Sequence, residues 1–78
     1  MKYDRFNLEE EIMNVWSTEE DLDTMLYRIM DAPGPPPTEV EIANLLIGLK
    51  ELHRSRCLKL WSVFETMIKD NCFNKNII

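Results

Sequence analysis

The second half of the chain carries a hydrophobic pattern with the period of an α-helix. Apolar or weakly polar residues recur at steps of three and four, a spacing that lines one face of a helix and cannot line one face of a strand. The members of this stripe are Ile42, Leu46, Leu49, His53, Cys57, Leu60, Phe64 and Met67. The pattern predicts a single helix over residues 39–71, of about nine turns.

A capping sequence marks the start of this helix. Thr38 is a favourable N-cap residue, and Glu41 three residues later completes a capping-box pattern. Glu39 and Glu41 also place acids in the first turn, where the helix dipole favours negative charge. We expect the helix to end near Asn71, which tolerates the left-handed conformation, and to be followed by a loose tail over residues 72–78.

An earlier segment, residues 8–31, shows a similar pattern with one interruption. Asn7 and Glu10 form a second capping-box pattern, which predicts that this helix starts at Leu8. Polar residues fill positions 17–21, so two alternatives stay open: two shorter helices with a bend near Ser17, or one continuous helix with a polar patch. The apolar positions are Leu8, Ile12, Val15, Trp16, Leu22, Met25, Leu26, Ile29 and Met30.

A proline-rich segment, residues 32–37, separates the two helices. Prolines lack the amide donor and push the preceding residue out of the helical conformation. We expect a semi-rigid turn between antiparallel helices, with a proline-rich ligand for an SH3-type groove as the alternative. The predicted fold class is therefore all-α, with residues 1–78 forming a single helical-hairpin domain.

The two helical segments differ in charge. Residues 8–31 hold eight acids against one base, Arg28, whereas residues 39–70 hold five of each. Folding the chain at the proline-rich turn brings Glu19 level with Lys50, so the hairpin is self-complementary in charge. Each exposed pair contributes only about 0–1 kcal/mol, so the pattern selects register more than it stabilises. The net charge of −5 disfavours binding to a nucleic-acid backbone.

His53 is the only histidine and stands four residues before Cys57. Such a pair can supply two zinc ligands, but no second pair is evident along the chain, so we expect no metal site. The favoured interpretation is a partly buried histidine between helices. A nucleophile would also need an orienting third group and a pocket, and the chain has no glycine-rich phosphate loop. We therefore expect neither catalysis nor a cofactor.

The cysteines indicate the compartment. Cys57 and Cys72 would lie about 22 Å apart on one straight helix, far beyond disulfide reach. They are expected to be thiols, as in a reducing compartment such as the cytoplasm. The longest apolar run is too short to span a membrane, and the first residues lack the apolar core of an export signal.

The basic residues of the second helix form one cluster: Lys50, Arg54, Arg56 and Lys59. The favoured interpretation is ion pairing with the first helix or with a neighbouring subunit. The alternative is an anion site for an acidic protein patch, or for a phosphorylated small ligand held between subunits, with Trp16 as a stacking surface.

The second helix also carries more apolar surface than one neighbouring helix can cover. A large exposed apolar patch usually marks an interaction site. The simplest closure is a two-fold dimer that makes a four-helix bundle. The residues expected in this subunit interface are Leu58, Leu60, Trp61, Phe64, Met67 and Ile68.

Several short motifs carry a resemblance to a known class of proteins. They are Phe6-x-Leu8-Glu9-x-x-Ile12-Met13-x-x-Trp16, then an acidic stretch into Leu22 and Tyr27, then Gly48-Leu49-Lys50-x-Leu52 and Lys59-Leu60-Trp61-x-x-Phe64-Glu65. With them the chain resembles small uncharacterised helical proteins of tailed bacteriophages, notably those that infect cyanobacteria. The resemblance implies expression in the cytoplasm of an infected bacterium.

Three functions are compatible with this reading. The first is a non-catalytic oligomeric interaction protein that binds and modulates a host or phage protein, as small phage proteins of this kind often do. The second is an oligomeric sponge that sequesters a nucleotide immune signal at a subunit junction through Arg54 and Arg56, together with Trp16 or Tyr27. The third is a structural subunit of a larger assembly.

Overall fold

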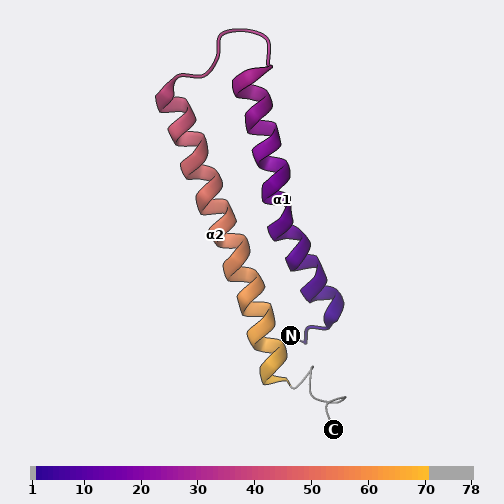
Figure 1. The fold of residues 1–78 in the computed structure, drawn as a ribbon. Coiled ribbons are helices and arrows are strands. Elements are labelled where there is room, and N and C mark those ends of the chain that lie inside the picture. The colour runs from indigo at the N-terminus through magenta and orange to yellow at the C-terminus, as the bar shows by residue number, and fades with distance from the viewer. Residues whose placement is uncertain (1, 71–78) are drawn as a thin grey trace.

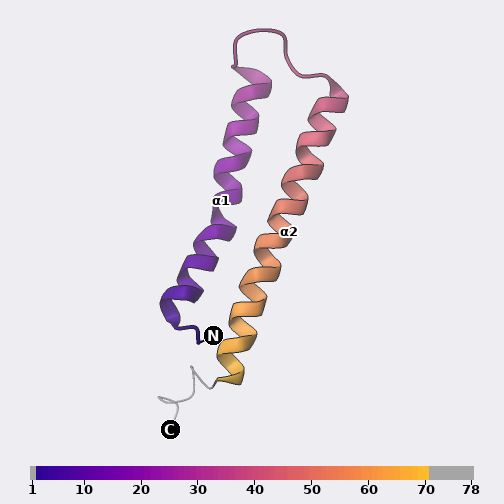
Figure 2. The same cartoon turned by 180° about the vertical axis from the view of Figure 1, so that it is seen from behind.

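The protein is a hairpin of two long antiparallel helices. The structure, a computed structural model, describes residues 2–70, and over this range it contains α1 (Arg5–Met30), α2 (Glu39–Lys69) and no strand. The helices lie side by side, with the turn at one end and the start of α1 and the end of α2 at the other (Figure 1). The view from behind shows the same single layer (Figure 2). The predicted all-α hairpin is thus confirmed, and the tail at residues 72–78 lies outside the described residues.

α1 begins earlier than the sequence predicts. Asp4 is the N-cap residue, and its carboxylate accepts hydrogen bonds from the backbone amides of Phe6, at 3.0 Å, and Asn7, at 3.1 Å. The side-chain oxygen of Asn7 in turn accepts a 2.9 Å hydrogen bond from the backbone amide of Asp4. The predicted start at Leu8 is wrong because Asp4 and Asn7 are both good cap residues, and the structure uses the first.

α1 is one continuous helix, which settles the two alternatives left open at Ser17. The Ser17 hydroxyl donates a 2.6 Å hydrogen bond to the carbonyl of Asn14 in the preceding turn. Such bonds from serine back to the helix backbone often bend a helix. Both views show α1 changing direction gently near its middle without a break (Figures 1 and 2).

The start of α2 matches its prediction. The Glu41 amide donates to Thr38 Oγ1 at 3.2 Å, and the Thr38 amide donates to Glu41 Oε1 at 3.1 Å, which completes the capping box. α2 ends at Lys69, with Asp70 as the C-cap residue, slightly before the expected end. In the turn, Gly34 has a φ of +96°, a backbone conformation that is strained for residues with a side chain and that glycine adopts readily.

Two helices alone bury very little. Within residues 2–70, Val63 and Met67 are the only fully buried apolar side chains, at 2% and 1% exposure. Five covered residues, Asn7, Glu11, Ser17, Phe64 and Thr66, each stand next in sequence to the line along which the two helices face each other. The side chains on that line are buried or half-buried, and we call them the inward-facing residues. On α1 they are Leu8, Ile12, Val15, Thr18, Asp21, Met25 and Ile29, and on α2 they are Ile42, Leu45, Leu49, His53, Arg56, Leu60, Val63 and Met67.

The inward-facing residues of α2 differ in part from the predicted stripe. Leu46 and Cys57 are exposed, while Leu45, Arg56 and Val63 take the facing positions. The apolar arc of α2 is wider than one stripe, so periodicity alone does not select the part of it that meets α1. Neither helix has the combination of length and apolar character that crossing a membrane requires.

Candidate interaction surface

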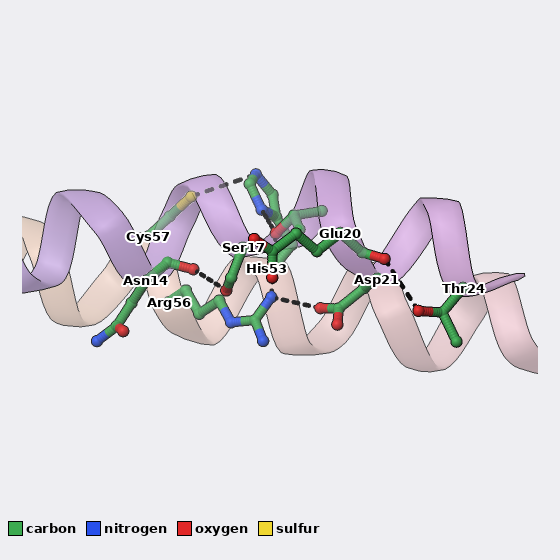
Figure 3. Close-up of polar contacts among 9 residues, drawn as sticks. Asn14, Ser17, Glu20, Asp21, Thr24, His53, Arg56 and Cys57 are labelled. Atoms are coloured by element: carbon green, nitrogen blue, oxygen red, sulfur yellow. Dashed lines mark hydrogen bonds and ion pairs between the residues drawn. The ribbon is translucent and has the colours of Figure 1, made fainter.

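A polar cluster lies at the middle of the contact between the helices. Arg56 reaches from α2 to α1, where its Nη1 donates to Asp21 Oδ2 at 2.8 Å and to Thr18 Oγ1 at 3.1 Å (Figure 3). The Arg56 side chain is only 20% exposed. Its charge is therefore held within the hairpin and is directed at α1.

His53 belongs to the same cluster. Its Nδ1 lies 2.7 Å from Thr18 Oγ1, and its Nε2 lies 3.5 Å from Cys57 Sγ, toward which the ring points (Figure 3). His53 is half-buried between the helices, as the sequence predicts. Cys57 is a free and exposed thiol.

A second ion pair ties the lower part of the hairpin together. Lys59 Nζ lies 3.2 Å from Glu11 Oε2, and the Asn14 amide donates to Glu11 Oε1 at 3.1 Å. The Glu11 side chain is only 7% exposed, and these contacts satisfy both of its oxygens. Across residues 2–70, every buried polar side-chain atom has a hydrogen-bond partner.

The four cations predicted to form one basic cluster separate into two kinds. Arg56 and Lys59 are paired with α1, in agreement with the ion-pair interpretation. Lys50 and Arg54 are exposed and make no ion pair among the described residues. Trp16 is also exposed, beside an open hollow of about 300 Å³ whose lining includes Glu19 and Glu20. An acidic lining does not suit a phosphate ligand.

The hairpin has one strongly apolar face. One step along an α-helix turns the side chain by about 100°. Because α1 and α2 are antiparallel, the residue after each inward-facing residue lies on the same face of the hairpin in both helices. On α1 such residues include Trp16, Leu26 and Met30, and on α2 they include Leu46, Trp61 and Ile68. All six side chains are large, apolar and between 49% and 74% exposed.

The opposite face is polar. It carries the residues that precede the same inward-facing positions, and these are Asn14, Thr24, Arg28, Asn44, Lys59 and Thr66. These six are polar or charged, and among the residues that precede the other inward-facing positions only Gly48 and the exposed Leu52 are not. The two faces of the hairpin therefore have different chemistry. We call them the apolar face and the polar face.

Further residues extend the apolar face. Leu22, Cys57 and Phe64 follow inward-facing residues, and the Phe64 ring lies 5.7 Å from the Trp61 ring between centroids.

Charged residues also stand on the apolar face, directly after inward-facing residues. They are acids on α1 and bases on α2. The acids are Glu9 and Glu19, and the bases are Lys50 and Arg54.

The structure places the predicted interface residues in three settings. Trp61, Phe64 and Ile68 lie on the apolar face. Leu60 and Met67 point inward, and Met67 is fully covered by the hairpin itself. Leu58 is exposed, but its helical position points away from α1. Sequence reasoning missed Leu26, Met30 and Leu46, whose common signal is that each directly follows an inward-facing residue.

Within residues 2–70 no group of three or more histidine, cysteine, aspartate or glutamate side chains is close enough to hold a metal ion. No protein-family model matches the chain, and neither a curated protein nor a solved structure matches it. The features of the hairpin that bear on its function are its two faces and the polar cluster between its helices.

Proposed function

We propose that this chain is a non-catalytic interaction protein whose apolar face binds a second copy of the chain, so that two hairpins close into a four-helix bundle. The observation that carries the proposal is the contrast between the apolar and polar faces. Exposed aromatic and aliphatic side chains lie along one face of both helices, and contiguous apolar surface of this kind marks interaction sites.

The exposed area supports a partner of similar size. The chain exposes 6530 Å², whereas a folded monomer of 9.3 kDa is expected to expose roughly 5,000 Å². The excess of about 1,500 Å² is comparable to what each subunit buries in an obligate dimer. The hairpin is a rod of 60 × 19 × 18 Å, so a second rod along its length is the closure that covers most of it.

Charge supports a second copy as that partner. A two-fold axis parallel to the helices places α1 of one copy over α2 of the other. Thr18 and His53 are in contact, so Glu19 lies at the height of Lys50 and Arg54. Across the axis, Glu19 of each copy then faces the two unpaired bases of the other. The alternative dimer, in which α2 of one copy lies over α2 of the other, would bring the bases Lys50 and Arg54 of the two copies together.

The resemblance implies that the protein binds a host or phage protein. In this proposal the dimer is the form that does so. The nucleotide-sponge alternative has less support. Two of the four cations of the basic cluster, Arg56 and Lys59, are already paired with carboxylates of α1. The hollow beside Trp16 is lined by the carboxylates of Glu19 and Glu20, whereas a phosphate needs hydrogen-bond donors or cations.

Analytical ultracentrifugation of the purified chain at micromolar concentration tests the proposal. We expect a mass of two chains for the unmodified protein and a monomer for Trp61→Glu, because the new charge would be desolvated on the apolar face. Ser62→Glu is the matched control, since it places the same charge one residue further on, toward the polar face. A compact monomeric unmodified protein would overturn the dimer and leave the apolar face to a foreign partner.

A further inference from the structure

We infer that the dimer proposed above binds one zinc-type metal ion on its two-fold axis, through His53 and Cys57 of both copies. The inference rests on that dimer, because one chain supplies only two ligands. Four ligands of this kind, two imidazoles and two thiolates, make a common tetrahedral zinc site.

The first support is the spacing of the two ligand atoms. Zinc binds histidine nitrogen at about 2.0–2.1 Å and cysteine sulfur at about 2.3 Å, so a tetrahedral angle sets them about 3.6 Å apart. His53 Nε2 and Cys57 Sγ are 3.5 Å apart. Both atoms point into the same space from successive turns of α2 (Figure 3). The pair therefore already has the separation of a chelating half-site.

The second support is the contact that orients His53. A metal-bound histidine usually donates its other ring N–H to a neighbouring acceptor, which fixes the ring and its tautomer. Thr18 Oγ1 stands 2.7 Å from Nδ1 and is itself held by Arg56, which pairs with Asp21. With the proton on Nδ1, His53 donates to Thr18, and Nε2, the ring nitrogen near Cys57, keeps the lone pair that binds a metal.

The third support is the position of the pair in the proposed bundle. His53 faces inward and Cys57 lies on the apolar face, so the pair sits between these two directions, toward the bundle axis. A two-fold axis parallel to the helices keeps every residue at the height of its own counterpart. The two half-sites then meet at one height near the middle of α2. The two α2 helices stand diagonally across the bundle axis, and side chains that project from bundle helices into the core commonly build metal sites.

The ligand set also indicates the class of metal. Thiolate and imidazole ligands in a tetrahedral arrangement suit zinc. On binding, each Cys57 thiol releases its proton to solvent, and the thiolate sulfur bonds to the metal. Two thiolates and two neutral imidazoles balance the charge of a divalent ion.

Cobalt(II) titration of the reduced full chain tests this site, because tetrahedral thiolate-bound cobalt absorbs visible and near-ultraviolet light. We expect the thiolate band to saturate at one cobalt per two chains and to disappear when zinc is added. Cys57→Ser and His53→Ala should lose the saturable band. The matched control is Cys72→Ser, which removes the other cysteine and should keep it.

Sedimentation in EDTA separates the failure of this inference from the failure of the dimer. If the chain sediments as a dimer in EDTA and the separate titration without EDTA gives no cobalt band, the metal site is overturned and the dimer stands. A monomer both in EDTA and with saturating zinc would overturn the dimer. Saturation at one cobalt per chain, or loss of the band in Cys72→Ser, would also contradict the shared site.

Discussion

The guanidinium of Arg56 lies 2.8 Å from the carboxylate of Asp21, in the middle of a helix contact that is otherwise mainly apolar. Together with Thr18 and His53, these residues form a polar layer that only one alignment of α1 against α2 can satisfy. Sliding one helix by a turn would leave partly buried charges without partners. We therefore interpret the layer as a device that fixes the register of the hairpin.

The first prediction concerns the strength of this pair. A double-mutant cycle with Asp21→Asn and Arg56→Gln, measured by urea unfolding, should give a coupling energy of about 1–2 kcal/mol, since the pair is only partly sheltered. The exposed pair between Arg5 and Glu9 is the matched control, and its coupling should stay below about 0.5 kcal/mol. Equal coupling in the two cycles would show that the Asp21–Arg56 contact is no stronger than a surface pair.

The second prediction concerns the start of α1. Asp4→Ala removes the acceptor for two backbone amides and should lower the free energy of unfolding by about 1 kcal/mol. Glu10→Ala, at the residue that the sequence pattern assigned to the cap, should change it by less than about 0.5 kcal/mol. A larger loss of unfolding free energy in Glu10→Ala than in Asp4→Ala would show that α1 starts at Leu8 in solution. Thermal and urea unfolding of both variants give the comparison.

The third prediction is a pH dependence at the start of α2. The backbone amide of Thr38 lowers the pKa of Glu41 below its usual 4.5, and the Thr38 side chain and the charge of Arg28 lower it further. Because the folded pKa is the lower one, the ionised carboxylate stabilises the fold above pH 4.5. This contribution is lost as the pH falls through the folded value.

Carboxyl-carbon NMR of Glu41 should therefore give a titration midpoint below 4.5. Glu41→Gln should destabilise the hairpin at pH 7 and have a smaller effect at pH 3, where the unmodified carboxyl is protonated. Glu39→Gln removes an acid from the same turn but no bond to Thr38, so it controls for the helix dipole. A midpoint at or above 4.5 contradicts the capping contact in solution.

The fourth prediction tests the charge arrangement across the proposed dimer. Glu19→Lys and Lys50→Glu should each weaken self-association by about tenfold, because each places like charges opposite one another. An equimolar mixture of the two variants should associate more tightly than either alone, and added salt should reduce the difference. Glu20→Lys is the matched control, since its helical position lies away from the apolar face. If the mixture associates no more tightly than either variant alone, the dimer arrangement with α1 of one copy over α2 of the other is ruled out.

Features set by neighbours in the chain could be predicted from the sequence alone. The two helices, the proline-rich turn and the Thr38–Glu41 cap follow from hydrophobic spacing and short-range hydrogen bonding, and the structure reproduces them. The start of α1 was missed because two cap residues stand one turn apart. Cap preference is nearly equal for Asp and Asn, so that preference alone could not choose between Asp4 and Asn7.

Tertiary structure decided which residues meet between the helices. The apolar arc of α2 is wide enough for several lines of contact, and the selected line places Arg56 inside and leaves Cys57 and Trp61 exposed. The choice depends on partners far away in the sequence, since Asp21 and Thr18 can satisfy Arg56 only after the chain has turned back. Helical periodicity fixes how residues are arranged around one helix, but the rotation of that helix against its neighbour is set by all the contacts between them.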